Sequence, residues 1–192
     1  MLYNLLFPLA DEAGFLNLFQ YLTFRTGGAV ITALIVSFLF GPVIIRTLKV
    51  RQGKGQPIRA DGPEGHLITK KGTPTMGGVL ILFGLLCGTL LWADLTSAHV
   101  WILLTITLGF GVIGFVDDFL KVRRQTSVGV PGRIKILLQI AIALGTTFWL
   151  IHLTGSEYNS GLALPFVKSI LIDLGWFFIP FAVFVMVGAS NA

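Results

Sequence analysis

The sequence predicts an all-α integral membrane protein, and two observations support this fold class. The first is composition: of 192 residues, 54% are hydrophobic and 12% are charged, whereas soluble domains carry roughly 25% charged residues. The second is a series of apolar stretches of about 20 residues, the length that a helix needs to cross the bilayer. These stretches predict about five membrane spans, near residues 26–45, 76–93, 97–116, 136–156 and 174–192.

The segments within and before the spans add detail. Residues 1–24 are apolar but interrupted by Asp11 and Glu12, so we expect a segment at the membrane interface rather than a sixth span. Gly84 and Gly88 form a small-xxx-small pair in the second span. This spacing predicts close packing against another helix.

The basic residues lie mostly in two segments between spans, and this sets the predicted orientation. The formal net charge of +5 would suggest nucleic-acid binding in a soluble protein, but here it follows the membrane pattern. Cytoplasmic loops carry an excess of lysine and arginine, so loops 46–75 and 117–135 are expected in the cytoplasm. The N-terminus is then outside, and the fifth span ends inside. We therefore expect a lipid bilayer as the environment and no nucleic-acid partner.

Asp117 and Asp118 directly follow the third apolar stretch and are the strongest candidates for chemistry. Two adjacent carboxylates at a membrane boundary are costly unless something pairs with them. If the helix continues, Lys121 follows at i+4 and i+3, and a divalent cation such as Mg²⁺ would also relieve the repulsion. The alternative is a solvated helix end that only marks the boundary. Negative charge at a helix C-terminus is unfavourable with the helix dipole, which favours the functional interpretation.

The two basic loops provide further candidates. Lys70 and Lys71 precede a stretch rich in glycine and threonine that ends at Gly78, and lysines beside a flexible backbone can meet phosphate. Composition alone favours topological charge followed by a flexible start of a helix. The second loop ends with Arg133 and Lys135. Two cationic loops around an acidic pair suit a polyanionic substrate, although anionic lipid headgroups explain them equally well.

Three stretches of this sequence resemble one family. They read Asp61-Gly-Pro-Glu-Gly-His66, Lys70-Lys-Gly-Thr-Pro-Thr-Met-Gly-Gly78 and Gly114-Phe-Val-Asp-Asp-Phe-Leu-Lys121. Together they are similar to the phospho-N-acetylmuramoyl-pentapeptide transferases, a branch of the polyprenyl-phosphate N-acetylhexosamine-1-phosphate transferases. The resemblance extends over essentially the whole chain, and the Gly-Thr-Pro-Thr-Met-Gly-Gly stretch is specific to this branch.

The resemblance implies an activity. Enzymes of this family transfer phospho-MurNAc-pentapeptide from UDP-MurNAc-pentapeptide to undecaprenyl phosphate, which releases UMP and forms lipid I in peptidoglycan biosynthesis. It further implies a Mg²⁺ requirement, the inner membrane of a bacterial cell as the location, an active face toward the cytoplasm, and a homodimer.

The resemblance also implies roles for individual residues. Asp117 and Asp118 match the family's acidic pair, of which one acts on the lipid phosphate as base or nucleophile and the other serves the metal. We assign Asp117 as the base. Lys121 matches the lysine that follows the pair, and Lys70 and Thr75 match positions that line the uridine-diphosphate site.

The family's chains are longer than this one, which sets one more expectation. Asn191 matches the first residue of an Asn-Leu-Thr-Asp-Gly-Leu-Asp-Gly motif, and the family continues from there to a further catalytic aspartate and a histidine cluster. We therefore expect residues 1–192 to be the N-terminal part of a single transmembrane transferase domain, with only part of the active site.

Other functions fit less well. A non-catalytic membrane module, such as half a transporter or an assembly subunit, is the main alternative. Transport predicts ionisable residues near the middle of the bilayer, and the five predicted spans have none there. Prenyltransferases of the Asp-Asp-x-x-Asp type need an acid where Lys121 stands. CDP-alcohol transferases need an aspartate array of which Asp61-Gly62 supplies only the beginning.

Overall fold

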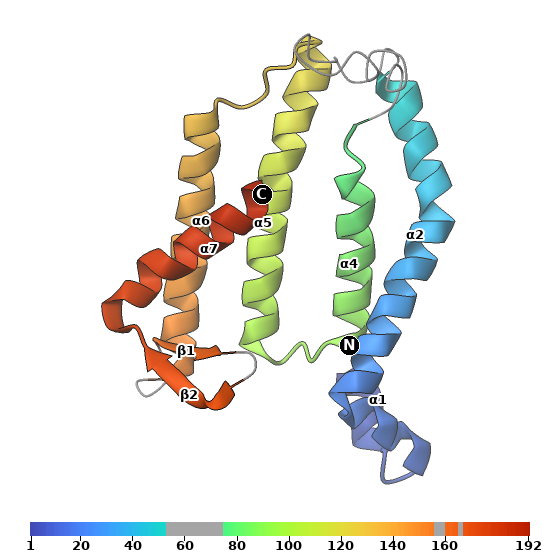
Figure 1. Ribbon diagram of the computed structural model, residues 1–192. Coiled ribbons are helices and arrows are strands. Elements are labelled where there is room, and N and C mark those ends of the chain that lie inside the picture. Colours follow the sequence, from blue (N-terminus) through green and yellow to red (C-terminus); the bar gives the residue numbers. More distant parts are fainter. Residues whose placement is uncertain (53–74, 156–159, 165–166) are drawn as a thin grey trace. The chain divides into compact units, whose positions relative to one another are not determined.

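The computed structural model describes residues 1–52, 75–155, 160–164 and 167–192 (Figure 1). The chain divides into two compact units. The first comprises Met1–Val100 and Gly114–Pro131, and the second comprises Trp101–Ile113 and Gly132–Ala192.

Five apolar helices lie at the five predicted spans. They are α2 (Leu22–Gln52), α4 (Gly78–Trp92), α5 (Ala98–Arg124), α6 (Gly132–Thr154) and α7 (Phe178–Asn191). Within the described residues, α2, α5 and α6 are long and apolar enough to cross a membrane, whereas α4 and α7 have 15 and 14 residues. The prediction of an all-α membrane protein is confirmed. That residues 1–192 belong to a single transferase domain stays a prediction.

Helices α2 and α5 continue beyond the apolar stretches that predicted them. The spans were expected to end near residues 45 and 116, whereas α2 ends at Gln52 and α5 ends at Arg124. The added turns contain lysine and arginine, which have good helix propensity and interact favourably with the negative end of the helix dipole. The polar extension of α5 carries most of the candidate active site.

Helices α2 and α4 pack with their backbones close together in the first unit. A Cβ atom at Gly88 would lie 2.8 Å from the backbone oxygen of Ala29, and one at Gly84 would lie 3.0 Å from Ser37 Oγ. Small residues permit this close approach, which contributes van der Waals contact where lipid gives no hydrophobic driving force. The predicted role of the glycine pair in helix packing is therefore confirmed.

The N-terminal segment forms short helices near the C-terminal end of α4. They are α1 (Leu2–Leu6), η1 (Phe7–Leu9) and η2 (Gly14–Gln20), each too short to span a bilayer. The Met1 ammonium donates to the carbonyl oxygens of Leu90 (3.0 Å) and Ala93 (3.1 Å) at the end of α4. A positive charge there satisfies free carbonyl groups and complements the dipole of that helix.

The second unit contains a β-hairpin that the sequence analysis did not predict. Strands β1 (Gly161–Leu164) and β2 (Val167–Asp173) pair antiparallel, with an irregular register after Ala163. β2 is rich in β-branched residues, which favour strands, and it is too short for a membrane helix. The 3₁₀ turn η3 (Gly175–Phe177) then leads to α7, which begins four residues later than the predicted span.

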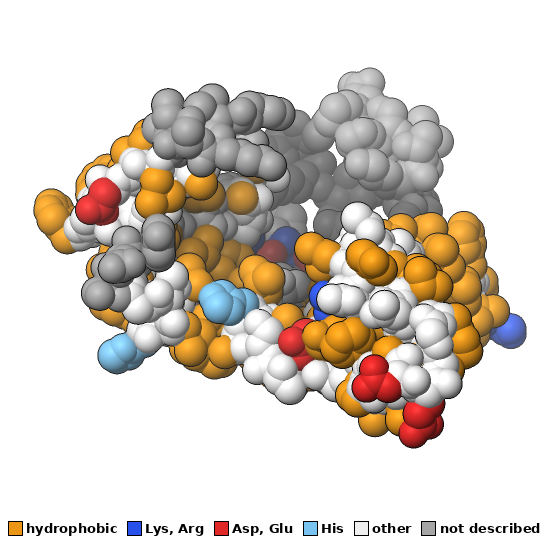
Figure 2. Space-filling model, turned by 90° about the horizontal axis from the view of Figure 1, so that it is seen from below, with side chains coloured by type: hydrophobic (Ala, Val, Ile, Leu, Met, Phe, Trp, Pro, Cys, Tyr) orange, Lys and Arg blue, Asp and Glu red, His pale blue; other side chains and the backbone are white. Residues whose placement is uncertain are grey.

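Apolar side chains make up much of the molecular surface. Viewed from below, most of the coloured side chains are hydrophobic and charged ones are few (Figure 2). Phe38 on α2 and Phe184 on α7 are 78% and 75% exposed. Soluble proteins rarely expose such large contiguous apolar areas, so these faces suit contact with lipid.

The packing of α2 against α4 predicts different effects for two glycine substitutions. Gly88→Ala should destabilise the protein by roughly 1–3 kcal/mol, because the new methyl group meets backbone that cannot move freely. Gly27→Ala on α2 is the matched control, since a Cβ there has no described atom within 4 Å. Thermal unfolding in detergent measures both. Equal stability of the two variants would contradict the packing.

Candidate active site

Asp117 and Asp118 lie inside helix α5, about two turns before its end at Arg124. The end of the apolar stretch predicted a helix C-terminus at this pair, where the helix dipole disfavours negative charge. This prediction was wrong, because α5 continues to Arg124 and the dipole effect falls off within the last turn. The cost of placing two adjacent carboxylates at a membrane boundary is unchanged by this correction.

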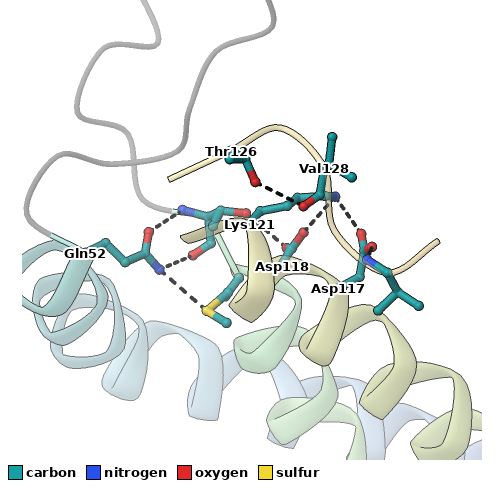
Figure 3. Close-up of polar contacts among 9 residues, drawn as sticks. Gln52, Asp117, Asp118, Lys121, Thr126 and Val128 are labelled. Carbon is teal, nitrogen blue, oxygen red and sulfur yellow. Dashed lines mark hydrogen bonds and ion pairs between the residues drawn. The ribbon is translucent and has the colours of Figure 1, made fainter. Parts of the chain in front are cut away.

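Lys121 lies between the two carboxylates, as its helical spacing predicted. Its Nζ is 2.5 Å from Asp117 Oδ2 and 3.4 Å from Asp118 Oδ1 (Figure 3). The side chain of Asp117 is 13% exposed and that of Asp118 is 31% exposed. The more buried carboxylate, which is costlier to desolvate, therefore has the closer ammonium group.

The loop after α5 folds back onto Asp117. The backbone N–H of Val130 donates to Asp117 Oδ1 over 2.8 Å. Gly129 is buried, and a Cβ there would lie 2.8 Å from the backbone oxygen of Asp117 and overlap its Oδ1. Only a residue without a side chain permits this approach. Sequence reasoning missed both loop residues, because one glycine among 23 gives no signal of its own.

Thr75 connects the start of α4 to the acidic pair. Its Oγ1 donates to Asp118 Oδ2 over 3.0 Å. The structure thus brings Thr75, Asp118 and Lys121 together, although 43 residues separate the threonine from the aspartate. The roles assigned to these residues stay predictions.

Gln52, the last residue of α2, holds the backbone of Thr75 (Figure 3). Its Oε1 accepts the Thr75 N–H over 2.9 Å, and its Nε2 donates to the Thr75 carbonyl over 3.1 Å. The same Nε2 lies 3.6 Å from Met76 Sδ. Sequence reasoning missed Gln52, because a polar residue after a membrane span is by default solvated.

The remaining predicted residues lie elsewhere. Lys70 lies outside the described residues. Arg133 and Lys135 occupy the first turn of α6 in the second unit, where the former is exposed and the latter is half-buried. Asn191 ends α7 in that unit, and its Nδ2 donates to Gln139 Oε1 on α6 over 2.8 Å.

The acidic pair fits a hard divalent cation such as Mg²⁺. Each of the four carboxylate oxygens accepts at least one hydrogen bond or ion pair, and ionised carboxylates are acceptors only. Mg²⁺ usually takes one or two carboxylates and completes its octahedron with water and substrate phosphate. Among the described residues, no group of three or more His, Cys, Asp or Glu side chains is placed to hold a metal ion.

These groups support chemistry on phosphates. A carboxylate held by a backbone N–H can accept a proton, and an adjacent lysine can stabilise charge on phosphate oxygens. Phosphoryl transfer depends mainly on such positioning and electrostatic stabilisation.

Two models of known families match segments of this chain. Residues 100–192 match the family model of glycosyl transferase family 4. Residues 70–82 match the phospho-N-acetylmuramoyl-pentapeptide-transferase signature 1. The acidic pair and Lys121 lie in the first matched segment, Thr75 lies in the second, and Gln52 lies in neither.

The close approach at Gly129 predicts that Gly129→Ala displaces the loop from Asp117. We expect the Val130 amide to lose protection against hydrogen exchange, because its acceptor can no longer be reached. Gly132→Ala is the control, since a Cβ there has no described atom within 4 Å. Exchange measured by mass spectrometry on peptides that cover 125–131 tests this, and unchanged protection in Gly129→Ala would contradict the geometry.

Proposed function

We propose a reaction for this chain, which is a membrane sugar-1-phosphate transferase similar to the phospho-N-acetylmuramoyl-pentapeptide transferases and which matches the model of glycosyl transferase family 4 over residues 100–192. The reaction is the transfer of phospho-MurNAc-pentapeptide from UDP-MurNAc-pentapeptide to undecaprenyl phosphate, which gives lipid I and UMP. The observation that carries the proposal is the hydrogen bond between Thr75 and Asp118. It joins the signature segment to the acidic pair of the family segment.

Asp117 is proposed as the base. In the reaction, an oxygen of the lipid phosphate forms a bond to the phosphorus next to the sugar, and the bond from that phosphorus to UMP breaks. Asp117 accepts the proton that the lipid phosphate carries. The Val130 N–H and Lys121 hold both oxygens of this carboxylate in place, which reduces the reorganisation needed during proton transfer.

Asp118 and Lys121 are proposed to act on charge. Thr75 and Lys121 fix the Asp118 carboxylate, so that with Asp117 it can hold Mg²⁺. A bound Mg²⁺ would neutralise the charge of the diphosphate oxygens. The ammonium group of Lys121 can also interact with these oxygens.

The proposed substrate contacts extend beyond the acidic pair. Lys70 and Thr75 are proposed to bind the uridine diphosphate, and Arg133, Lys135 and Asn191 are proposed as further contacts of the substrates. Arg133 and Lys135 stand in the first turn of α6, where the helix dipole disfavours cations. Contact with the negative charges of the substrates would offset this unfavourable interaction.

The proposed location is the inner membrane of a bacterial cell. The basic residues in the last turns of α2 and α5 support a site on the cytoplasmic face, since cytoplasmic loops carry the excess of lysine and arginine. A homodimer is proposed with it.

The proposal predicts that Asp117→Asn and Asp118→Asn each abolish most of the transfer. We expect a loss of roughly 10²–10⁴-fold, the contribution of a positioned proton acceptor. The assay follows UMP release and the lipid product with the natural full-length protein in detergent. Asp11→Asn, an exposed acid of the N-terminal segment, is the control. Undiminished turnover in both site variants would contradict the roles proposed for the acidic pair, whereas no transfer by the wild-type protein would favour a non-catalytic membrane module.

Metal removal gives an independent prediction. Chelation with EDTA should stop the transfer, and added Mg²⁺ should restore it, because carboxylate and phosphate oxygens are its preferred ligands. Asp118→Asn should raise the Mg²⁺ concentration needed for half-maximal rate. Full turnover in EDTA would exclude the proposed metal.

A further inference from the structure

We infer that Gln52 is a positioning residue of this site, which acts on Asp118 through Thr75. The inference rests on the proposed function and extends it to a residue outside both segments matched by known families. Three contacts in series carry it, from the Gln52 carboxamide to the Thr75 backbone, from the Thr75 hydroxyl to Asp118, and from Asp118 to Lys121.

The burial of Gln52 is the first argument. The residue is 7% exposed, although it ends a helix whose neighbouring Arg51 is exposed. Burying a carboxamide is costly unless its donor and acceptor are both bonded. Both groups of Gln52 are bonded to one residue, Thr75. The two bonds hold the N–H before the Thr75 Cα and the carbonyl after it, as a neighbouring β-strand would.

The backbone around Thr75 is the second argument. Met76 has a φ of +71°, a conformation that residues with a side chain adopt only at an energetic cost. Such a conformation persists where surrounding contacts determine it. Gln52 contacts this turn through the Thr75 backbone and the Met76 sulfur. The turn directs the Thr75 hydroxyl to Asp118 Oδ2.

The link to chemistry follows from the hydroxyl. A threonine hydroxyl donates one hydrogen bond, and here it donates to the carboxylate that is proposed to serve the metal. Without the two bonds from Gln52, the backbone at Thr75 could move, and its hydroxyl would no longer be held against Asp118. The carboxylate would then keep Lys121 as its described partner but lose the contact that fixes its second oxygen. Residues that orient metal-binding carboxylates commonly affect activity without touching the substrate.

The test uses two substitutions of Gln52 in the natural full-length protein with Mg²⁺ present. Gln52→Met keeps the length of the side chain and removes both hydrogen bonds. Gln52→Glu keeps an acceptor for the Thr75 N–H and loses the donor, so it remains informative if the first variant does not fold. Gln125→Met is the matched control, because Gln125 is exposed and donates only to Val122 of its own helix among the described residues.

We expect Gln52→Met to lower kcat by roughly 10–100-fold with KM for the nucleotide substrate within about twofold of wild type. Gln52→Glu should fall between it and wild type, and Gln125→Met should match wild type. If Gln52 only stabilised the fold, Gln52→Met would lower the thermal stability and the amount of folded protein, but the folded fraction would not show a lower kcat at unchanged KM. An unchanged kcat in folded Gln52→Met would overturn the inference.

A double-mutant cycle tests whether the effect passes through Thr75. Gln52→Met combined with Thr75→Val should be no slower than Thr75→Val alone, because the hydroxyl that Gln52 positions is already absent. Multiplicative losses would contradict the series of contacts.

Hydrogen exchange separates this inference from the proposed function. The Thr75 amide should be protected in wild type and in Gln125→Met, and it should exchange faster in Gln52→Met. If wild type shows this protection but no transfer, the proposed function fails and the positioning role fails with it. If wild type is active while the Gln52 variants are unchanged in rate and exchange, only the positioning role fails.

Discussion

Two adjacent carboxylates on a membrane helix repel each other, and each loses solvation near the lipid. Around the C-terminal part of α5, three groups offset this cost by contacting the carboxylates. Lys121 lies one turn further along the same helix, Val130 supplies a backbone N–H, and Thr75 supplies a hydroxyl. The approach of Gly129 and the burial of Gln52 follow from the need to hold these donors in place. The same two carboxylates supply the oxygen ligands that a hard cation such as Mg²⁺ prefers.

The groups around the pair differ in how they are held. Asp117, Asp118 and Lys121 are spaced by the helix itself, so their relative positions require no tertiary contact. The position of Thr75, by contrast, depends on a tertiary contact, because Gln52 of α2 holds its backbone N–H and carbonyl. The first unit is kept compact by the packing of α2 against α4, where glycines permit the backbones to approach. Helix packing in this unit therefore bears on the chemistry through one short segment.

The hydrophobic pattern and the spacing of the charged residues predicted the fold class and part of the candidate site. The apolar stretches gave the fold class and the approximate positions of the helices, because lipid requires long apolar helices. The spacing of Lys121 from the pair gave its contact. The resemblance to known transferases assigned Thr75 to the uridine-diphosphate site, but it did not predict its contact with Asp118. The argument from the helix dipole failed, because polar residues after the apolar stretch extend α5 to Arg124.

The features that could not be predicted are tertiary. Gln52 and Thr75 are 23 residues apart, and Val130 and Asp117 are 13 apart, and one sequence carries no signal for such pairs. The β-hairpin was missed because its strands are short and contain no hairpin turn signal. Since Asp117, Asp118 and Lys121 all lie on α5, a displacement of the segment that carries Thr75 would leave their spacing along the helix unchanged. Among the bonds described here, it would break the one from Thr75 to Asp118. The hydrogen bond from Thr75 to Asp118 can therefore open and close with the position of the signature segment, while the helix keeps the three charged residues at a fixed spacing.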